Sequence, residues 1–247
     1  MPGIRFEALD LRPWRMVEAQ HHISTLALVD DVQEQAVLED LLEAVKPPLP
    51  SDGGFERLHY LLATPFRYPP LRYGSRFGTR AERGIWYGAL EERTSMAEVA
   101  YYRLLFLEGS TEDLGIMRTE HSLFQAQVRT DQGIDLCRPP FDRQKSALAS
   151  PTSHVASQRL GRTLREGGIE AFVYPSARDR EGGACLGVFD PRAFARKSPI
   201  QRVIPTWRCL ARRDEVVFDR LDTIRRRQMV FGRGEFLVRG KLPIMGA

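Results

Sequence analysis

Apolar positions follow a helical spacing near the start of the chain and a strand-like spacing further on. In residues 30–48, apolar side chains recur three and four positions apart, acids fill the first turn and two prolines follow. This pattern predicts an amphipathic helix that ends at the prolines. Its apolar stripe consists of Val37, Leu38, Leu41, Leu42 and Val45. An earlier helix is predicted over residues 13–24, because proline is favoured in the first helical turn.

Beyond residue 60 the pattern alternates between helix and strand. Short runs rich in Val, Ile and Phe, bounded by turn residues, predict strands over residues 84–90, 123–129, 169–175, 184–190, 203–211 and 215–221. A helix is predicted from Met96 to about Leu107, and another over residues 153–168 that closes on two glycines. The last two strands are separated by three residues, which indicates a hairpin. The predicted fold class is α+β, with a sheet-dominated second half.

The segment 47–54, rich in proline and glycine, is the best candidate for a domain boundary. We expect residues 1–50 to form an N-terminal helical extension and residues 51–247 to form the main domain. A chain of 247 residues with 43% hydrophobic content is long enough to bury a sizeable core.

Charge is distributed unevenly along the chain, whose net charge is +4. Residues 1–50 hold four Lys and Arg against nine Asp and Glu, whereas residues 192–247 hold fourteen against five. The basic excess is densest at Arg225, Arg226 and Arg227. A solvated basic face is the simplest interpretation, and an acidic partner surface is the next. A nucleic-acid groove ranks third, because no nucleic-acid-binding motif accompanies the charge.

Several functional classes find no support in the sequence. No apolar run approaches the roughly 20 residues of a membrane helix, and the start lacks a secretory pattern, so we expect a cytoplasmic protein. The scattered cysteines are interpreted as reduced core residues (Cys137, Cys185 and Cys209). No metal-ligand spacing, phosphate loop, dinucleotide fingerprint or nucleophile elbow occurs, and no metal is expected.

The start of the helix at Met96 contains the first candidate residue. Ser95 and Glu98 are three positions apart and fit a capping box, so Glu98 has a simple structural explanation. A carboxylate fixed at a helix start can also stabilise positive charge that develops during a reaction. The two roles can coexist.

Other candidates lie in turns, strands and a helix. Arg76, between two glycines, is either a turn residue or a forked ligand for phosphate. Tyr87 is either a core aromatic of its strand or a stacking surface for a flat heterocycle. Ser176 follows a strand and precedes Arg178, where it serves turn chemistry or presents its hydroxyl to a ligand. Ser157 fits a helix position.

Taken together and in order, these segments resemble the RES-domain family, which is named for its recurring arginine, glutamate and serine. The resemblance is carried by "GSRFG" with Arg76, "IWYGA" with Tyr87, "SMAEVAYYR" with Glu98 and "GGIEAFVYPSARDREGGACLGVFDP" with Ser176. The resemblance covers about residues 62–191. Basic C-terminal strands are expected after it, in residues 192–247. The preceding residues are similar to the N-terminal extension of longer family members.

This resemblance implies a toxin of a bacterial toxin–antitoxin pair, with a fold similar to ADP-ribosyltransferases, NAD as substrate and no metal. The implied partner is a small helical antitoxin that occludes the active site. By the family pattern Arg76 would hold NAD phosphate, Tyr87 would pack near nicotinamide or ribose, and Glu98 would contact the reacting ribose. Ser176 would complete the pocket with Arg178 nearby, and Ser157 is the alternative for the family's serine.

Three activities stay open at this stage. The first is cleavage of the nicotinamide–ribose bond with transfer of ADP-ribose to a cellular protein, for which the acidic and basic flanking segments offer surface. The second is phosphorolysis or hydrolysis of NAD, which would deplete the cell of it. The third is a non-enzymatic binding module that uses the basic tail. For the toxin, contact with nucleic acid is expected only through the antitoxin.

Overall fold

The structure is a computed structural model that describes residues 5–19, 33–34, 37–38, 41, 45–51, 53–55, 57–70, 72–220 and 227–244. Its strands are β1 (Glu7–Leu11), β2 (Trp14–Glu18), β3 (Trp86–Ala89), β4 (Met117–Gln125), β5 (Val128–Asp135), β6 (Ala171–Pro175), β7 (Ala184–Val188), β8 (Thr206–Ala211), β9 (Glu215–Arg220) and β10 (Gln228–Gly232). The described α-helices are α3 (Tyr60–Arg67), α4 (Glu92–Gly109), α5 (Lys145–Leu148) and α6 (Val155–Glu166). Short 3-10 turns occur at Phe141–Gln144, Pro191–Ala193 and Arg233–Phe236.

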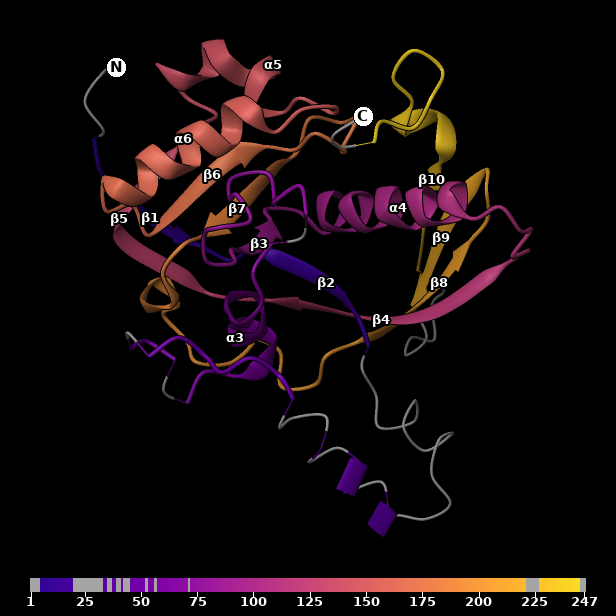
Figure 1. The fold of residues 1–247 in the computed structure, drawn as a ribbon, viewed down its shortest axis with the longest axis horizontal. Helices are drawn as coiled ribbons and strands as arrows, with labels where there is room; N and C mark the ends of the chain where they lie inside the picture. The colour runs from indigo at the N-terminus through magenta and orange to yellow at the C-terminus, as the bar shows by residue number, and fades with distance from the viewer. Residues whose placement is uncertain are drawn as a thin grey trace.

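The described strands form one ten-stranded sheet in the order β1-β5-β6-β7-β3-β2-β4-β8-β9-β10 (Figure 1). Neighbouring strands are antiparallel except β5 and β6, which are parallel. Helices packed on a mixed sheet confirm the prediction of an α+β fold. The further likeness to ADP-ribosyltransferases stays a prediction.

The sheet opens between β2 and β3. These strands pair at a single register position, Trp14 with Ala89, whereas β2 pairs with β4 at five positions. Beyond that position, the guanidinium of Arg15 donates to the main-chain carbonyl of Tyr87. A side chain therefore takes the place of a ladder hydrogen bond in the middle of the sheet.

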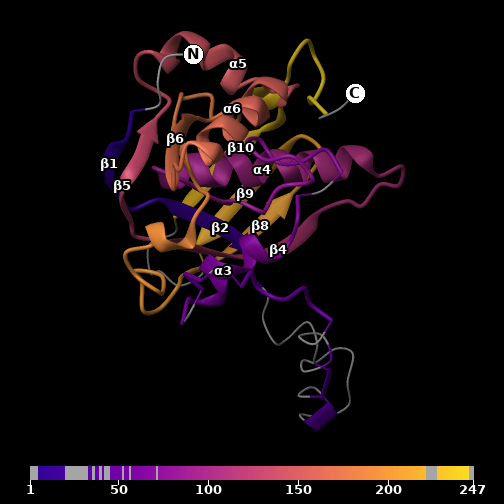
Figure 2. The ribbon, with the colours of Figure 1, turned by 60° about the vertical axis from the view of Figure 1, so that its left-hand side comes forward.

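Helices cover both faces of the sheet, as the alternation along β6 shows. Ala171 and Val173 belong to the core beneath α3, while Phe172 and Tyr174 belong to the core beneath α6. The third core lies under α4, which buries Met96, Ala97, Ala100, Tyr101, Leu104 and Leu107. In both Figure 1 and Figure 2, α3 lies apart from α4 and α6, below them.

The helix predicted over residues 13–24 is wrong where the structure describes it. Trp14–Glu18 forms β2, and the rest of that helix lies largely outside the described residues. Side chains alternate between the two faces of β2, which buries Met16 against α4. Pairing of β2 with β4 outweighs the preference for a helix that Pro13 suggested. Residues 7–18 therefore belong to the sheet and not to a helical extension. The boundary near residue 50 stays a prediction.

The second N-terminal helix agrees with the sequence where it is described. Residues 33–34, 37–38 and 41 are helical, while Leu42 of the predicted stripe lies outside the described residues. Val37, Leu41 and Val45 are exposed, so these parts of the stripe do not pack on the domain.

Most of the other predicted elements are confirmed, including the β8–β9 hairpin and the helix that ends at Gly167 and Gly168. The single strand predicted over residues 123–129 is wrong, because β4 ends and β5 begins within it. At this break the N–H of Ala126 donates to the carbonyl of Pro13 at 3.0 Å. Strand β10 was not predicted. Of the helices in the described ranges, none has the length and apolar content needed to cross a membrane.

Candidate functional site

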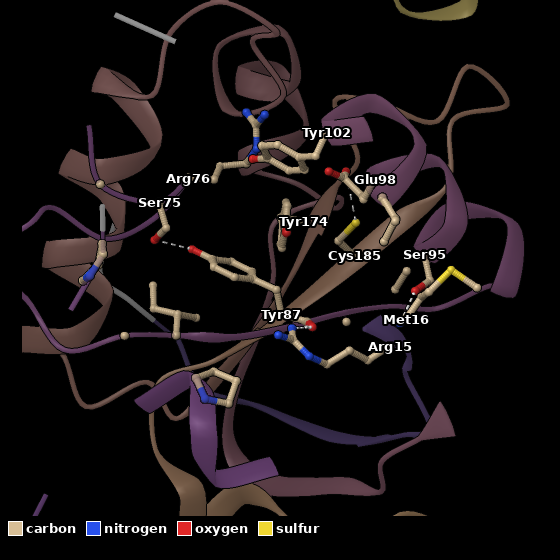
Figure 3. A pocket seen from close by; sticks show the side chains of 18 of the residues that line it. Arg15, Met16, Ser75, Arg76, Tyr87, Ser95, Glu98, Tyr102, Tyr174 and Cys185 are labelled. Atoms are coloured by element: carbon tan, nitrogen blue, oxygen red, sulfur yellow. Dashed lines mark hydrogen bonds between the residues drawn. The ribbon is translucent and has the colours of Figure 1, made fainter. Parts of the chain in front are cut away.

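A cavity of about 600 Å³ lies where β2 and β3 diverge (Figure 3). Its volume falls within the range of ligand-binding pockets. β2, β3, β6, β7, the end of α3, α4 and the loops before β3 and α6 all contribute lining residues. Among the residues named from the sequence, the cavity brings together Arg76, Tyr87 and Glu98.

A tight loop presents Arg76 to the cavity. Gly74 in this loop has φ +74°, and an added β-carbon there would lie 2.4 Å from the carbonyl oxygen of Gly78, so glycine is required. The side chain of Arg76 is buried, and its Nη1 donates to the carbonyls of Leu148 at 3.1 Å and Ser150 at 2.9 Å. These bonds fix the guanidinium without neutralising its charge.

Tyr87 is held by the same loop. Its hydroxyl shares a 2.9 Å hydrogen bond with Ser75 Oγ and accepts from the N–H of Phe77 at 3.1 Å. Burial raises the pKa of Tyr87 to about 12, so the phenol is neutral at pH 7. The ring packs edge-on to Tyr174 with centroids 6.1 Å apart. Tyr87 thus packs against the core and also gives the cavity a fixed aromatic surface.

Glu98 and Ser176 are joined by a short hydrogen bond. Ser176 Oγ donates to Glu98 Oε1 at 2.7 Å. Ser176 Oγ also accepts hydrogen bonds from the N–H groups of Arg178 and Asp179, both at 3.1 Å. Because those two donors occupy its lone pairs, the hydroxyl proton is left to point at the carboxylate. Ser176 therefore orients Glu98 within the cavity wall.

The predicted capping box is wrong. Helix α4 begins at Glu92, and the N–H of Ser95 already bonds to the carbonyl of Glu91 at 3.1 Å. Ser95 is therefore inside the helix, where its hydroxyl accepts the N–H of Met16 from β2 at 2.9 Å. Glu98 lies in the second turn and has no part in starting the helix.

The two candidate serines, Ser157 and Ser176, have different hydrogen-bond partners. Ser157 is fully buried in α6, and its hydroxyl donates to the carbonyl of Arg76 at 2.6 Å. It supports the arginine loop from behind. Ser176 is the serine bonded to Glu98.

Alanine substitutions should separate these two roles. Ser157→Ala leaves a buried carbonyl without its donor and should cost about 1–3 kcal/mol in the free energy of unfolding. Ser176→Ala removes a hydrogen bond to a carboxylate and should lower turnover by roughly tenfold or more. Denaturant unfolding and steady-state kinetics on both variants test this. A stable but inactive Ser157→Ala beside a fully active Ser176→Ala would reverse the assignment.

Arg178, expected to bind the ligand, is not brought to the cavity. Its side chain is buried, and its guanidinium carbon lies 3.5 Å from the ring centroid of Tyr101, a cation–π arrangement. The next residue, Asp179, accepts from Thr94 Oγ1 at 2.6 Å and pairs with Arg93. The turn after β6 is thereby fastened to the first turn of α4.

Sequence reasoning missed several residues that line the cavity, namely Arg15, His154, Tyr174 and Cys185. Tyr174 could have been found, because strand alternation places it on the same face as Ser176, two positions on. Cys185 faces Tyr174 across the β6–β7 pair, and no local pattern predicts that pairing. Arg15 lay in a segment that was predicted to be helical.

The side chains that line the cavity carry a net positive charge at pH 7. Burial, with Glu98 nearby, raises the pKa values of the Cys185 thiol and the Tyr174 phenol well above their usual ranges. Burial also lowers the pKa of His154 to about 4, assisted by two neighbouring arginines. All three are therefore neutral at pH 7. Of the described residues, the charged side chains that line the cavity are Arg15, Arg76 and Glu98.

Two guanidinium groups against one carboxylate suit an anionic ligand with a local cationic centre. Within the described ranges, His, Cys, Asp and Glu side chains form no group of three or more that could hold a metal ion.

Comparison with protein-family models gives a match to the RES domain over residues 55–211, more than half of the chain. Comparison with the curated proteins gives no match. The matched range contains Arg76, Tyr87, Glu98 and Ser176, whereas Arg15 precedes it. RES domains are found in toxins that use NAD and are paired with antitoxins. This chain belongs to the RES-domain family.

Proposed function

We propose that this protein is a bacterial toxin that breaks the nicotinamide–ribose bond of NAD and transfers ADP-ribose to a cellular protein. One observation carries the proposal. Arg76, Tyr87 and Glu98 converge on one cavity, and Ser176 holds the carboxylate of Glu98 at 2.7 Å. The positive balance of the cavity suits the pyrophosphate of NAD, and the carboxylate suits a cationic reacting centre.

Each residue then has a role set by its surroundings. Arg76 binds the pyrophosphate through the guanidinium edge left free by its two carbonyl partners. The fixed ring of Tyr87 packs against nicotinamide or its ribose. Glu98 contacts the ribose, and Ser176 keeps it in place.

The reaction needs stabilisation of a developing charge. When the bond between ribose C1′ and the pyridinium nitrogen breaks, its electrons pass to the nitrogen and nicotinamide leaves neutral. The ribose takes on oxocarbenium character, as in glycoside cleavage. A preorganised carboxylate stabilises that charge more in the transition state than in the ground state. A nucleophilic side chain of the acceptor then bonds to C1′ and gives up its proton to solvent.

Exposed aromatic residues at the rim of the cavity favour the binding of a macromolecular partner. Tyr68 and Tyr102 both line the cavity, yet they are 41% and 57% exposed. Phe106, one helical turn beyond Tyr102 on α4, is 59% exposed. Aromatic residues of this kind are enriched in protein interfaces. We propose that the helical antitoxin, and the acceptor protein in its absence, dock on this rim.

The basic tail gives less support to a non-enzymatic module. Several of its arginines pair with acids of the same chain, namely Arg208 with Asp219, Arg212 with Glu215, Arg227 with Glu92 and Arg233 with Glu108. Paired arginines offer less charge for phosphate contacts. Arg225 and Arg226 lie outside the described residues.

Labelled NAD tests the proposal. The protein, freed of antitoxin, is incubated with a cell lysate and NAD carrying the label in its adenylate half. Label on a discrete protein, with release of nicotinamide, is the expected result. Conversion of NAD only when phosphate is added, or to free ADP-ribose, with no labelled protein, would replace transfer by phosphorolysis or hydrolysis. A protein that leaves NAD intact would overturn the proposal altogether.

Arg76→Ala should weaken NAD binding more than it slows the chemical step. A charge-assisted hydrogen bond of about 1.5–3 kcal/mol corresponds to a rise in KM of roughly 10- to 100-fold, since the contact exists in ground and transition states alike. Arg162→Ala is the control, because this α6 arginine is exposed and outside the cavity. Equal KM values for the two variants would remove Arg76 from the phosphate site.

A further inference from the structure

The cavity contains an arginine that the RES match does not include. Arg15 lies on β2, forty residues before the matched range begins. Its Nη1 donates to the carbonyl of Tyr87, while its Nε is buried without a hydrogen-bond partner in the described part of the chain. Leaving a buried donor unpaired costs about 1–3 kcal/mol. An acceptor oxygen supplied by a ligand would remove that cost.

Among the described residues, Arg15 also has no carboxylate partner. Burial lowers its pKa only to about 10, so it is charged at pH 7. The phenol of Tyr174 lies near it, and the centroid of the Trp86 ring lies 5.5 Å from its guanidinium carbon. By contrast, the partly buried Arg93 and Arg103 both pair with carboxylates. A cation sequestered without an acid favours the binding of an anion.

The two cavity arginines approach from different sides. In the view of Figure 3, Arg76 and Glu98 lie above the ring of Tyr87, and Arg15 lies below it. They come from separate elements, the loop before β3 and the strand β2. Each guanidinium is held by a main-chain carbonyl, so each has a fixed position from which to contact an anion.

We propose that Arg15 is a second phosphate-binding residue of this cavity, acting on phosphate oxygens that Arg76 does not hold. This inference rests on the proposed function for the identity of the substrate. The phosphate can come from the pyrophosphate of NAD or from free inorganic phosphate. In the second case, a phosphate oxygen would form the bond to the ribose C1′ as nicotinamide leaves, and the product would be ADP-ribose that carries a phosphate on that carbon.

The test uses Arg15→Gln and Arg15→Lys in the full chain. Glutamine keeps a polar side chain but carries no charge, and lysine keeps the charge without the fork. Arg103→Gln is the matched control, since Arg103 is partly buried and ion-paired but lies outside the cavity. Thermal melts, steady-state kinetics in NAD and in phosphate, and calorimetric titration with inorganic pyrophosphate and inorganic phosphate are compared with the parent.

We expect Arg15→Gln to raise the KM for NAD by roughly 10- to 100-fold and to weaken pyrophosphate binding by a similar factor, with a smaller change in kcat. Arg15→Lys should recover part of the loss, and Arg103→Gln should keep the parent KM. If free phosphate is the ligand, Arg15→Gln instead loses phosphate binding and any phosphate dependence of turnover, while the KM for NAD is unchanged.

Parent-like affinity of a folded Arg15→Gln for NAD, pyrophosphate and phosphate would leave Arg15 as a structural plug between β2 and β3. Should Arg15→Gln fail to fold, the same criteria apply to Arg15→Lys, which should show a smaller rise in KM. A parent that binds pyrophosphate through Arg15 but never consumes NAD would overturn the proposed function and leave this inference standing. A parent that binds neither anion would overturn the inference.

Discussion

Glu98→Gln is expected to lower NAD turnover by roughly 100-fold or more, the scale seen when a preorganised electrostatic group is lost from an active site. Glutamine has the same shape, and its Oε1 can still accept the hydrogen bond from Ser176. The substitution therefore removes a negative charge from the cavity and leaves the packing in place.

Stability should barely change in this variant. Because α4 begins at Glu92 and Ser95 already lies inside it, Glu98 caps nothing, and we expect a shift of only a few tenths of a kcal/mol. Steady-state kinetics and thermal melts measure the two effects. Glu92→Gln is the control on the same helix, since Glu92 pairs with Arg227 outside the cavity and its loss should leave turnover within about twofold of the parent. Undiminished turnover in Glu98→Gln would remove Glu98 from the catalytic site.

Much of the site could be predicted from the sequence because its parts are local. Arg76, Tyr87 and Glu98 lie within 23 consecutive residues, on a loop, a strand and a helix whose order the hydrophobic pattern predicts. Ser176 follows a buried strand that the pattern also predicts. The motifs then specify which residues matter, and the structure brings three of them to one cavity.

The rest depends on strand pairing over long distances, which local patterns do not encode. Arg15 reaches Tyr87 across 72 positions because β2 inserts between β3 and β4. Nothing in residues 13–24 indicates that insertion, and the proline signal pointed to a helix instead. Arg15 was missed as a cavity residue for the same reason that β2 was missed as a strand.

The capping box failed for a related reason. Its residue types are right, but tertiary partners take their hydrogen bonds. Ser95 accepts from Met16 of β2, and its neighbour Thr94 donates to Asp179 after β6. The helix therefore begins one turn earlier than the local pattern predicts, with Glu91 as its N-cap residue. Tertiary contacts outweighed a local preference of about 1 kcal/mol.

Asp179→Ala should have the largest effect on stability, a loss of about 2–4 kcal/mol in the free energy of unfolding. The side chain of Asp179 is 1% exposed and accepts from Thr94 Oγ1 at 2.6 Å, from the N–H of Glu181 at 3.1 Å and from Arg93. Alanine leaves the hydroxyl of Thr94 and the N–H of Glu181 without this acceptor. Arg93 keeps Glu181 and Glu235 as partners and is 21% exposed, so we place the loss below that of a fully buried pair.

Activity should fall with stability, because the same turn carries Ser176. With Asp179 gone, the turn loses its bonds to Thr94 and Arg93 of α4, and we expect the hydrogen bond from Ser176 to Glu98 to lose its alignment. Asp179→Asn is the matched variant: its amide oxygen still accepts from Thr94, so about half of the loss should return. Urea unfolding at constant m value measures stability, and kcat is taken at temperatures where each variant is folded. If Asp179→Ala unfolds at the parent's midpoint, the pairing of β6 with β7 alone positions Ser176.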